Sequence, residues 1–257
     1  MIQSQNDTLT DLLSEHGVHR LGDQKVNFYL VEQAGGLVLV DAGLPTHFVQ
    51  LSDAVTAIGR SMHDITDVVI THAHPDHVGI AARVQRETGA RIWVHSADAP
   101  IVNDPKSMSK HWKAERSLVP YILRRPAMLS VPIHLGRNGA FKPAAVANVN
   151  TFADGEVLPV PGAPTAIQVP GHTTGSTAFA FPGMIFTGDA LVTRDDMIGR
   201  SGPRIVARAF TQNGAQALAS IGKLVSTDAA LVLPGHGDPY TEGIAKAVRE
   251  ATAAGIS

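Results

Sequence analysis

Cysteine is absent from the 257-residue chain. Without thiols the protein forms no disulfide, holds no sulfur-rich metal site and uses no cysteine nucleophile. No stretch approaches the ~20 apolar residues of a membrane-spanning helix, and residues 1–17 lack the parts of a secretory signal. A formal net charge of −2 gives no overall nucleic-acid signature. We therefore expect a cytoplasmic protein with no membrane partner and no nucleic-acid partner.

The strongest chemical signal is the hexapeptide His72-Ala73-His74-Pro75-Asp76-His77. Three imidazoles and a carboxylate within six residues are typical of a metal site. Residues 67–71 form a predicted buried strand and 78–87 a predicted helix, so the cluster follows a strand end, where α/β sheets place ligands. Side-chain alternation directs His72 and His74 toward one ion. Asp76 and His77 lie beyond the proline and can face a second ion.

Three further blocks each place a ligand-type side chain beside glycine at the end of an apolar strand. His172 follows the predicted strand 165–169, Asp189 ends an apolar run from residue 185, and His236 ends one from residue 231. Glycine at such positions lets the backbone approach closely. Together with the hexapeptide these residues predict a site for two divalent metal ions. Imidazole and carboxylate ligands suit Zn²⁺, with iron or manganese as alternatives.

The ordered blocks H-x-H-x-D-H, G-H, G-D and G-H resemble the signature of the metallo-β-lactamase-fold hydrolase superfamily over about residues 25–251. The resemblance implies an α/β fold, a four-layer αββα sandwich of two mixed β-sheets with outer helices. It implies that Asp189 bridges two metals whose other ligands are His72, His74 and His172 for the first and Asp76, His77 and His236 for the second. Asp41 matches the Asp-x-Gly turn that orients a ligating imidazole in this superfamily.

Within the superfamily, the chain is most similar to the branch of glyoxalase II-like thioesterases and lactonases. The full set of seven ligands is shared by these enzymes, by related esterases and by tRNA 3′-processing nucleases. β-Lactamases with a cysteine ligand do not fit a chain without cysteine. Glyoxalase II proper adds a C-terminal helical domain, whereas only 21 residues (237–257) follow His236 here, which argues against glutathione thioesters specifically.

These ligands predict a dinuclear metal-dependent hydrolase acting on a small ester, thioester or lactone. Two cations roughly 3.5–4 Å apart can share a bridging water and lower its pKa toward about 7, so hydroxide is the expected nucleophile. Asp76 is the candidate catalytic residue that carries a proton to the leaving group. Two alternatives stay open, namely a phosphodiesterase or nuclease at the same site, and a metal-binding redox protein that hydrolyses nothing.

The remaining pattern predicts a single domain over residues 1–257 with a basic, largely helical insertion at about 97–150. Strands are expected at 25–31, 37–40, 91–95, 157–158, 165–169, 177–181, 184–186 and 229–233, and helices at 45–58, 213–225 and 241–253. Within the insertion we expect a helix over 107–118 that ends near Pro120. Its candidate substrate contacts are Trp112, Arg116 and Tyr121. The insertion is interpreted either as a lid that attracts an anionic small molecule or as a solvated basic face.

Overall fold

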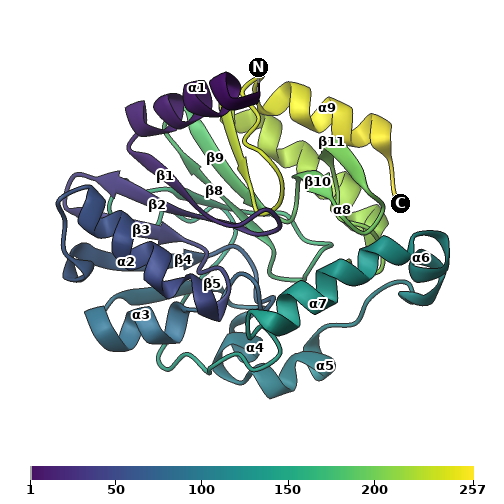
Figure 1. Ribbon diagram of the computed structural model, residues 1–257, viewed down its shortest axis with the longest axis horizontal. Helices are drawn as coiled ribbons and strands as arrows, with labels where there is room; N and C mark the ends of the chain where they lie inside the picture. The colour runs from purple at the N-terminus through teal and green to yellow at the C-terminus, as the bar shows by residue number, and fades with distance from the viewer. Residues whose placement is uncertain (1) are drawn as a thin grey trace.

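The computed structural model describes residues 2–257 and the side chains from residue 9 onward. Figure 1 shows two β-sheets packed face to face, with helices on both outer sides. This is the αββα sandwich that the family resemblance implies, and the predicted fold class is confirmed.

The first sheet has six strands in the order β1-β2-β3-β4-β5-β6. Its strands are β1 (Val18–Gly22), β2 (Asn27–Gln33), β3 (Gly36–Val40), β4 (Ile65–Ile70), β5 (Arg91–His95) and β6 (Asn150–Phe152). The first three are antiparallel neighbours, and β3 to β6 run parallel. Because β4 and β5 are parallel, the loops that follow them lie at the same edge of the sheet.

The second sheet has four strands in the order β12-β9-β8-β7. These are β7 (Thr165–Gln168), β8 (Thr177–Phe181), β9 (Met184–Gly188) and β12 (Leu231–Pro234), and a separate hairpin joins β10 (Val192–Asp195) to β11 (Arg200–Arg204). β8 is antiparallel to both neighbours, and β12 is parallel to β9. The carboxyl ends of β7, β9 and β12 therefore meet at one edge.

Helices cover the outer faces of both sheets (Figure 1). The α-helices are α1 (Ile2–Glu15), α2 (Phe48–Ala57), α3 (Ala81–Thr88), α4 (Ala99–Asn103), α5 (Met108–His111), α6 (Val119–Arg124), α7 (Ser130–Arg137), α8 (Gly214–Ser220) and α9 (Ile244–Ala254). Short 3-10 helices are η1 (Pro45–His47), η2 (Met62–Asp64), η3 (Pro105–Ser107), η4 (Pro126–Leu129) and η5 (Ile221–Thr227). None of the helices in residues 2–257 has the length and hydrophobicity needed to cross a bilayer.

Three apolar layers hold the sandwich together. Alternate residues of β3 belong to two different layers. Val38 and Val40 face the second sheet, whereas Leu37 and Leu39 pack under the helices α2 to α4. A third layer lies between the second sheet and the helices α8 and α9. Because both faces of β3 are covered, all five of its residues are buried, which explains its continuous hydrophobic run.

The insertion is helical from α4 to α7, but the predicted helix over 107–118 is wrong. The helix α5 ends at His111, and the backbone N–H groups of Glu115 and Arg116 instead donate to the carbonyls of Thr211 and Arg208. Tertiary hydrogen bonds to this distant loop replace the helical ones. Pro120 does not stop a helix either, because it lies in the first turn of α6, where its missing N–H has no cost.

Elsewhere the strands that bear the candidate ligands lie within two residues of their predicted bounds, while 157–158 forms only an isolated bridge from Val157 to Thr165. The strands β1, β6, β10 and β11 were not predicted. They are short, and β11 contains glycine and proline, so their sequences carry little strand signal.

Candidate metal centre

The seven side chains predicted as metal ligands come together at the edge where the strand ends meet. Four follow β4 in one loop, and the others follow β7, β9 and β12 of the second sheet. Three overlapping groups of their atoms lie within metal-binding reach of one another: His72, His74 and His172; His72, His77 and Asp189; and Asp76, His77 and His236. The cluster thus draws on both halves of the sandwich.

The first group is a compact triangle of three imidazole nitrogens. His72 Nε2 and His74 Nδ1 are 3.1 Å apart, and His172 Nε2 lies 3.2 and 2.9 Å from them. A tetrahedral zinc site with Zn–N bonds of ~2.0–2.1 Å requires ligand atoms about 3.3 Å apart, close to these distances. Burial, reinforced by neighbouring imidazoles, lowers the pKa of His72. Burial likewise lowers the pKa of His74 and His172, so the three rings are neutral and offer lone pairs.

The second group is more acidic and opens toward solvent. Asp76 Oδ2 lies 3.9 Å from His77 Nε2 and 3.6 Å from His236 Nε2. The side chains of Asp76 and His236 are 14% and 22% exposed, so this side of the cluster is reached by solvent. Burial alone would lower the pKa of His77, but the carboxylates of Asp189, Asp41 and Asp76 outweigh it and raise that pKa to about 9.

Asp189 lies between the two groups. Its Oδ2 is 3.1 Å from His236 Nε2 and 3.5 Å from His172 Nε2, and its Oδ1 is 3.4 Å from His77 Nε2. Burial would raise the pKa of this carboxyl, but the charges of His236 and His77 hold it well below its usual range. This carboxylate therefore faces nitrogens of both groups, with Oδ2 near His172 and His236 and Oδ1 near His77, and would contact cations held by either group.

Buried atoms without hydrogen-bond partners indicate that the cluster fits metal. In the described part of the chain five buried side-chain atoms lack a partner, and three of them are His74 Nε2, His77 Nε2 and Asp189 Oδ1. The last two face each other at 3.4 Å. Leaving such groups unpaired costs about 1–3 kcal/mol each. A cation would pair with both, and a donor set of imidazoles and carboxylates without thiolate suits zinc, iron or manganese.

Asp41, which the family resemblance pairs with a ligating imidazole, hydrogen-bonds to His77. Its Oδ2 accepts from His77 Nδ1 at 2.8 Å, and its two oxygens also accept from the N–H and hydroxyl of Thr71. Asp41 follows β3 with φ of 60°, a left-handed conformation that aspartate tolerates better than most residues. The proton is thereby held on Nδ1, and Nε2 of His77 faces the cluster.

Asp98 is a supporting residue that sequence reasoning missed. It is buried beyond β5, and its Oδ2 accepts from Ala73 N at 3.0 Å and from Thr173 Oγ1 at 2.8 Å. Its Oδ1 accepts from Gly175 N at 2.8 Å. One carboxylate therefore joins the loop of His72 and His74 to the loop of His172. A signal did exist, since Asp98 follows a predicted strand parallel to the one that bears the hexapeptide.

The loop of His236 is held by the first β-hairpin. His236 Nδ1 donates to the carbonyl of Lys25, and Pro234 O accepts from Tyr29 Oη at 2.8 Å and from Asn27 Nδ2 at 2.9 Å. These partners are about 210 residues apart in the sequence, so no local pattern reveals them.

The three candidate substrate contacts are placed differently. Trp112 lies beside the cluster: its ring packs edge-on against His74 with centroids 4.8 Å apart, and Nε1 donates to His172 O at 3.0 Å. Arg116 is exposed and its backbone N–H donates to Arg208 O. Tyr121 packs beside Met128 and Met197, and its hydroxyl donates to Ser257 O. The structure therefore brings only Trp112 of these three to the histidines.

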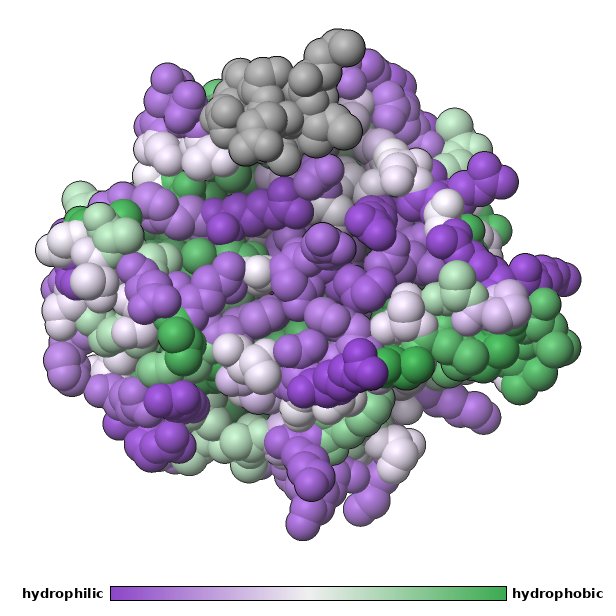
Figure 2. Space-filling view, in the orientation of Figure 1, coloured by the Kyte–Doolittle hydropathy of each residue, from purple (hydrophilic) through white to green (hydrophobic). Residues whose placement is uncertain are grey.

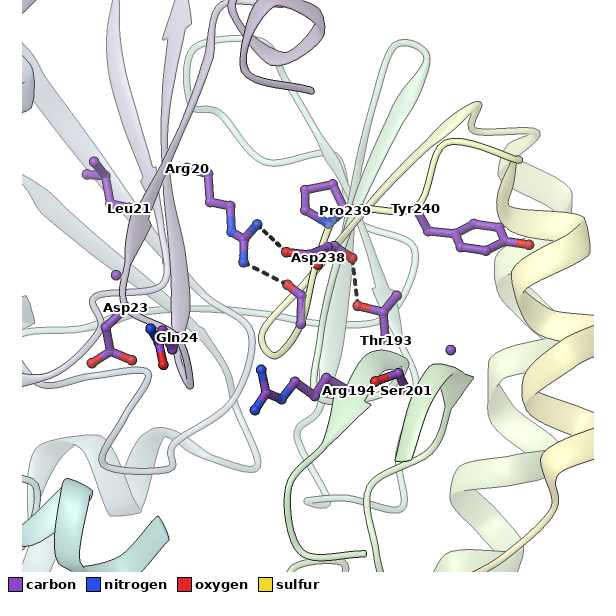
Figure 3. A pocket seen from close by; sticks show the side chains of 13 residues that line it. Arg20, Leu21, Asp23, Gln24, Thr193, Arg194, Ser201, Asp238, Pro239 and Tyr240 are labelled. Carbon is purple, nitrogen blue, oxygen red and sulfur yellow. Dashed lines mark hydrogen bonds and ion pairs between the residues drawn. The ribbon is translucent and has the colours of Figure 1, made fainter. Parts of the chain in front are cut away.

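A cavity of about 630 Å³ lies next to the cluster but does not contain it (Figure 3). Its walls are the end of β1, the hairpin β10–β11 and the loop after His236. Arg20 points across it, donating to Asp238 Oδ1 at 2.8 Å and to Gly237 O at 3.1 Å. None of the seven candidate ligands lines this cavity.

Comparison with known proteins gives a consistent result. The family model described as the metallo-beta-lactamase superfamily matches residues 21–236. The uncharacterized protein YobT of Bacillus subtilis is 29% identical over 219 residues, covering 82% of this chain and 83% of that protein. The probable metallo-hydrolase YflN of the same organism is 25% identical, covering 88% and 85%.

A hydroxyacylglutathione hydrolase of Fuscovulum blasticum is 27% identical over 220 residues, covering 84% of this chain and 63% of that enzyme. Among solved structures, the metallo-beta-lactamase family protein TTHA1429 from Thermus thermophilus superposes with a TM-score of 0.67 at 23% identity. That match covers 93% of this chain and 79% of the other and shows the shared fold.

Proposed function

Because this chain belongs to the metallo-beta-lactamase superfamily, whose members are mostly metal-dependent hydrolases, we propose that it hydrolyses a small ester, thioester or lactone with two divalent metal ions. The observation that carries the proposal is the position of Asp189, whose carboxylate lies within 3.5 Å of nitrogens from both groups of imidazoles. Zinc is the first candidate metal, because histidine and carboxylate ligands without thiolate suit it.

Each of the seven side chains has an assigned place. His72, His74 and His172 would hold one ion, Asp76, His77 and His236 the other, and Asp189 would contact both. Bound divalent ions supply Lewis acidity toward a substrate oxygen and make hydroxide available near neutral pH. Asp41 and the Lys25 carbonyl keep protons on Nδ1 of His77 and of His236, so the Nε2 atoms stay directed at the cluster.

Asp76 is the proposed proton carrier. Its carboxylate is at the solvent-facing side of the cluster, where a leaving alkoxide or thiolate would depart. Asp76 Oδ2 lies 3.6 Å from His236 Nε2, on the side of the cluster from which the leaving group would depart. The chain contains no cysteine and no Gly-x-Ser-x-Gly elbow, so neither of these two nucleophiles competes with water.

Two observations bear on the substrate class. The relative named as a hydroxyacylglutathione hydrolase favours a thioester or related ester. Trp112 offers an aromatic wall beside His74, and the exposed cations of the insertion favour a substrate with an anionic group. We propose Trp112 as the substrate contact of the insertion.

The test is proton release on a panel of an acyl thioester, an acyl lactone, a phosphodiester and a cephalosporin, using metal-reconstituted protein. We expect turnover of one carbonyl substrate that is abolished in Asp189→Ala and retained in Asp53→Asn, an exposed carboxylate on α2. Turnover of the phosphodiester alone would replace this proposal with a nuclease. No proton release with any of the four substrates, from protein with two bound ions, would favour a redox or other non-hydrolytic role.

A further inference from the structure

Exposed apolar side chains are concentrated on the insertion. Of the ten large apolar residues that are exposed in the described part of the chain, six lie between residues 118 and 141. These six define the insertion patch: Leu118, Val119, Leu123, Leu129, Ile133 and Phe141. Figure 2 shows a broad hydrophobic area at the right-hand edge of the molecule, where Figure 1 places α6 and the start of α7. Leu123 is 77% and Phe141 66% exposed, so these side chains are almost fully in solvent.

The patch is not the inner side of a helix left uncovered. Tyr121 and Ile122 of α6 and Val131 of α7 already pack inward against Met128 and Met197. The outward residues have helical spacing of their own, since Val119 and Leu123 are four residues apart, as are Leu129 and Ile133. The segment is therefore apolar on two sides, and only one of them is used by the fold.

Charge on the same segment has a single sign. From Leu118 to Lys142 the sequence contains no aspartate or glutamate. Arg124, Arg137 and Lys142 are exposed there. The acidic residues that reach this segment from other elements are already paired, Asp23 with His134 and Asp196 with Lys25. Exposed apolar side chains accompanied by exposed cations are typical of segments that lie on an anionic membrane surface.

We propose that the insertion patch docks on the surface of an anionic lipid bilayer, with its apolar side chains inserted at the headgroup level and its cations against lipid phosphates. The helices α6 and α7 have only six and eight residues, so they lie on the surface and do not span it. A second copy of the chain fits less well, because two such patches would bring like charges together without acidic partners. This proposal replaces the expectation of no membrane partner, which rested on the absence of a spanning segment.

The test is flotation of metal-reconstituted protein with vesicles of phosphatidylcholine alone or mixed with phosphatidylglycerol. We expect binding to the mixed vesicles that weakens with salt, and little binding to the neutral ones. The double variant Leu123→Gln, Phe141→Gln should lower partitioning roughly tenfold or more, because it removes two inserted side chains. Arg124→Gln and Lys142→Gln should each lower it about fivefold and reduce the salt dependence.

Val49→Gln is the matched control, because Val49 is 64% exposed on α2, outside the patch. It should bind vesicles like the unmodified protein. Absence of binding to anionic vesicles, or binding that the Leu123→Gln, Phe141→Gln variant leaves unchanged, would overturn the proposal. So would a dimer in sedimentation velocity that this variant dissociates while no vesicle binds, because the patch would then be a self-association face.

Discussion

At the scale of single residues, the candidate centre depends on carboxylates that bind no metal as much as on those that would. Asp41 fixes the ring of His77, and Asp98 fixes two loops with one side chain. Both accept hydrogen bonds from three donors while buried. The role of Asp41 was predicted from its Asp-x-Gly context. That of Asp98 was not, because its place after a predicted strand does not show that it accepts from Ala73, Thr173 and Gly175 in two distant loops.

Asp98→Ala should lower the free energy of unfolding by about 3–5 kcal/mol, because it leaves two backbone N–H groups and the Thr173 hydroxyl without their acceptor. Asp98→Asn keeps the shape and part of the accepting capacity, so its loss should be smaller. Urea unfolding of metal-free protein measures both. Zinc titration should in addition show weaker binding by the His72, His74 and His172 group. Equal stability of Asp98→Ala and the unmodified protein would contradict the assigned role.

Asp23 gives the fold a specific acid sensitivity. Burial alone would raise the pKa of Asp23, but hydrogen bonds from His47 and from the N–H groups of Lys25 and Val26, with the charge of His134, outweigh it and lower that pKa. Because the folded-state pKa lies below the unfolded value of 3.8, this carboxylate stabilises the fold above that pH. Its contribution is lost as pH falls below the unfolded pKa toward the folded one.

Asp23→Asn should therefore cost about 1–2 kcal/mol at neutral pH and flatten the loss of stability below about pH 4. Guanidinium unfolding of metal-free protein at several pH values measures this, with Asp53→Asn as the control. If Asp23→Asn kept the full acid-induced loss of the unmodified protein, the cause would lie elsewhere.

At the scale of elements, the strand ends and the helical character of the insertion were predictable, and the helix bounds within the insertion were not. Apolar runs followed by glycine and a ligand-type residue located β9 and β12, because a buried strand needs a continuous hydrophobic sequence and a close backbone turn needs glycine. Residues 112–118 failed as a helix because the N–H groups of Glu115 and Arg116 bind carbonyls of residues 211 and 208. Contacts between segments almost one hundred residues apart decided the structure there.

The turn after β12 packs closely against two candidate ligands. A Cβ built on Gly235 would lie 2.4 Å from Asp189 Oδ1 and 2.7 Å from His77 Cε1. Gly235→Ala should therefore displace a ligand and lower the hydrolytic rate by about 10²-fold, as expected for a misplacement near 1 Å. The measurement is turnover at saturating metal together with zinc affinity.

Gly222→Ala is the matched control, because a Cβ at Gly222 meets no atom within 4 Å. It should leave rate and affinity unchanged. Unimpaired turnover and zinc binding in Gly235→Ala would show that Asp189 and His77 are not held where this account needs them.

At the scale of the whole molecule, the centre joins the two halves of the sandwich. Four candidate ligands follow β4 of the first sheet, and three follow strands of the second. The order of the motifs made this convergence predictable through the family resemblance. The hydrogen bonds that Lys25, Asn27 and Tyr29 make with the loop of His236 were not predictable. They require the first β-hairpin to lie against the loop after β12.

Because bound metal would cross-link both halves, its removal should destabilise the entire fold. An ion at about one hundred times its Kd contributes about 2.7 kcal/mol, so chelation should lower Tm by about 5–10 °C. Thermal unfolding with and without EDTA measures the shift, which should be smaller in His172→Ala. An unchanged Tm of the unmodified protein after verified metal loss would contradict a cross-linking centre.

The most direct test of the central claim, that these seven side chains hold two ions, is the metal content per chain after zinc reconstitution and desalting, measured by inductively coupled plasma mass spectrometry. The account predicts about two ions in the unmodified protein and about one in each of His172→Ala and His236→Ala, because each variant removes a ligand of one group. About one ion or fewer in the unmodified protein, or two ions in both variants, would contradict it.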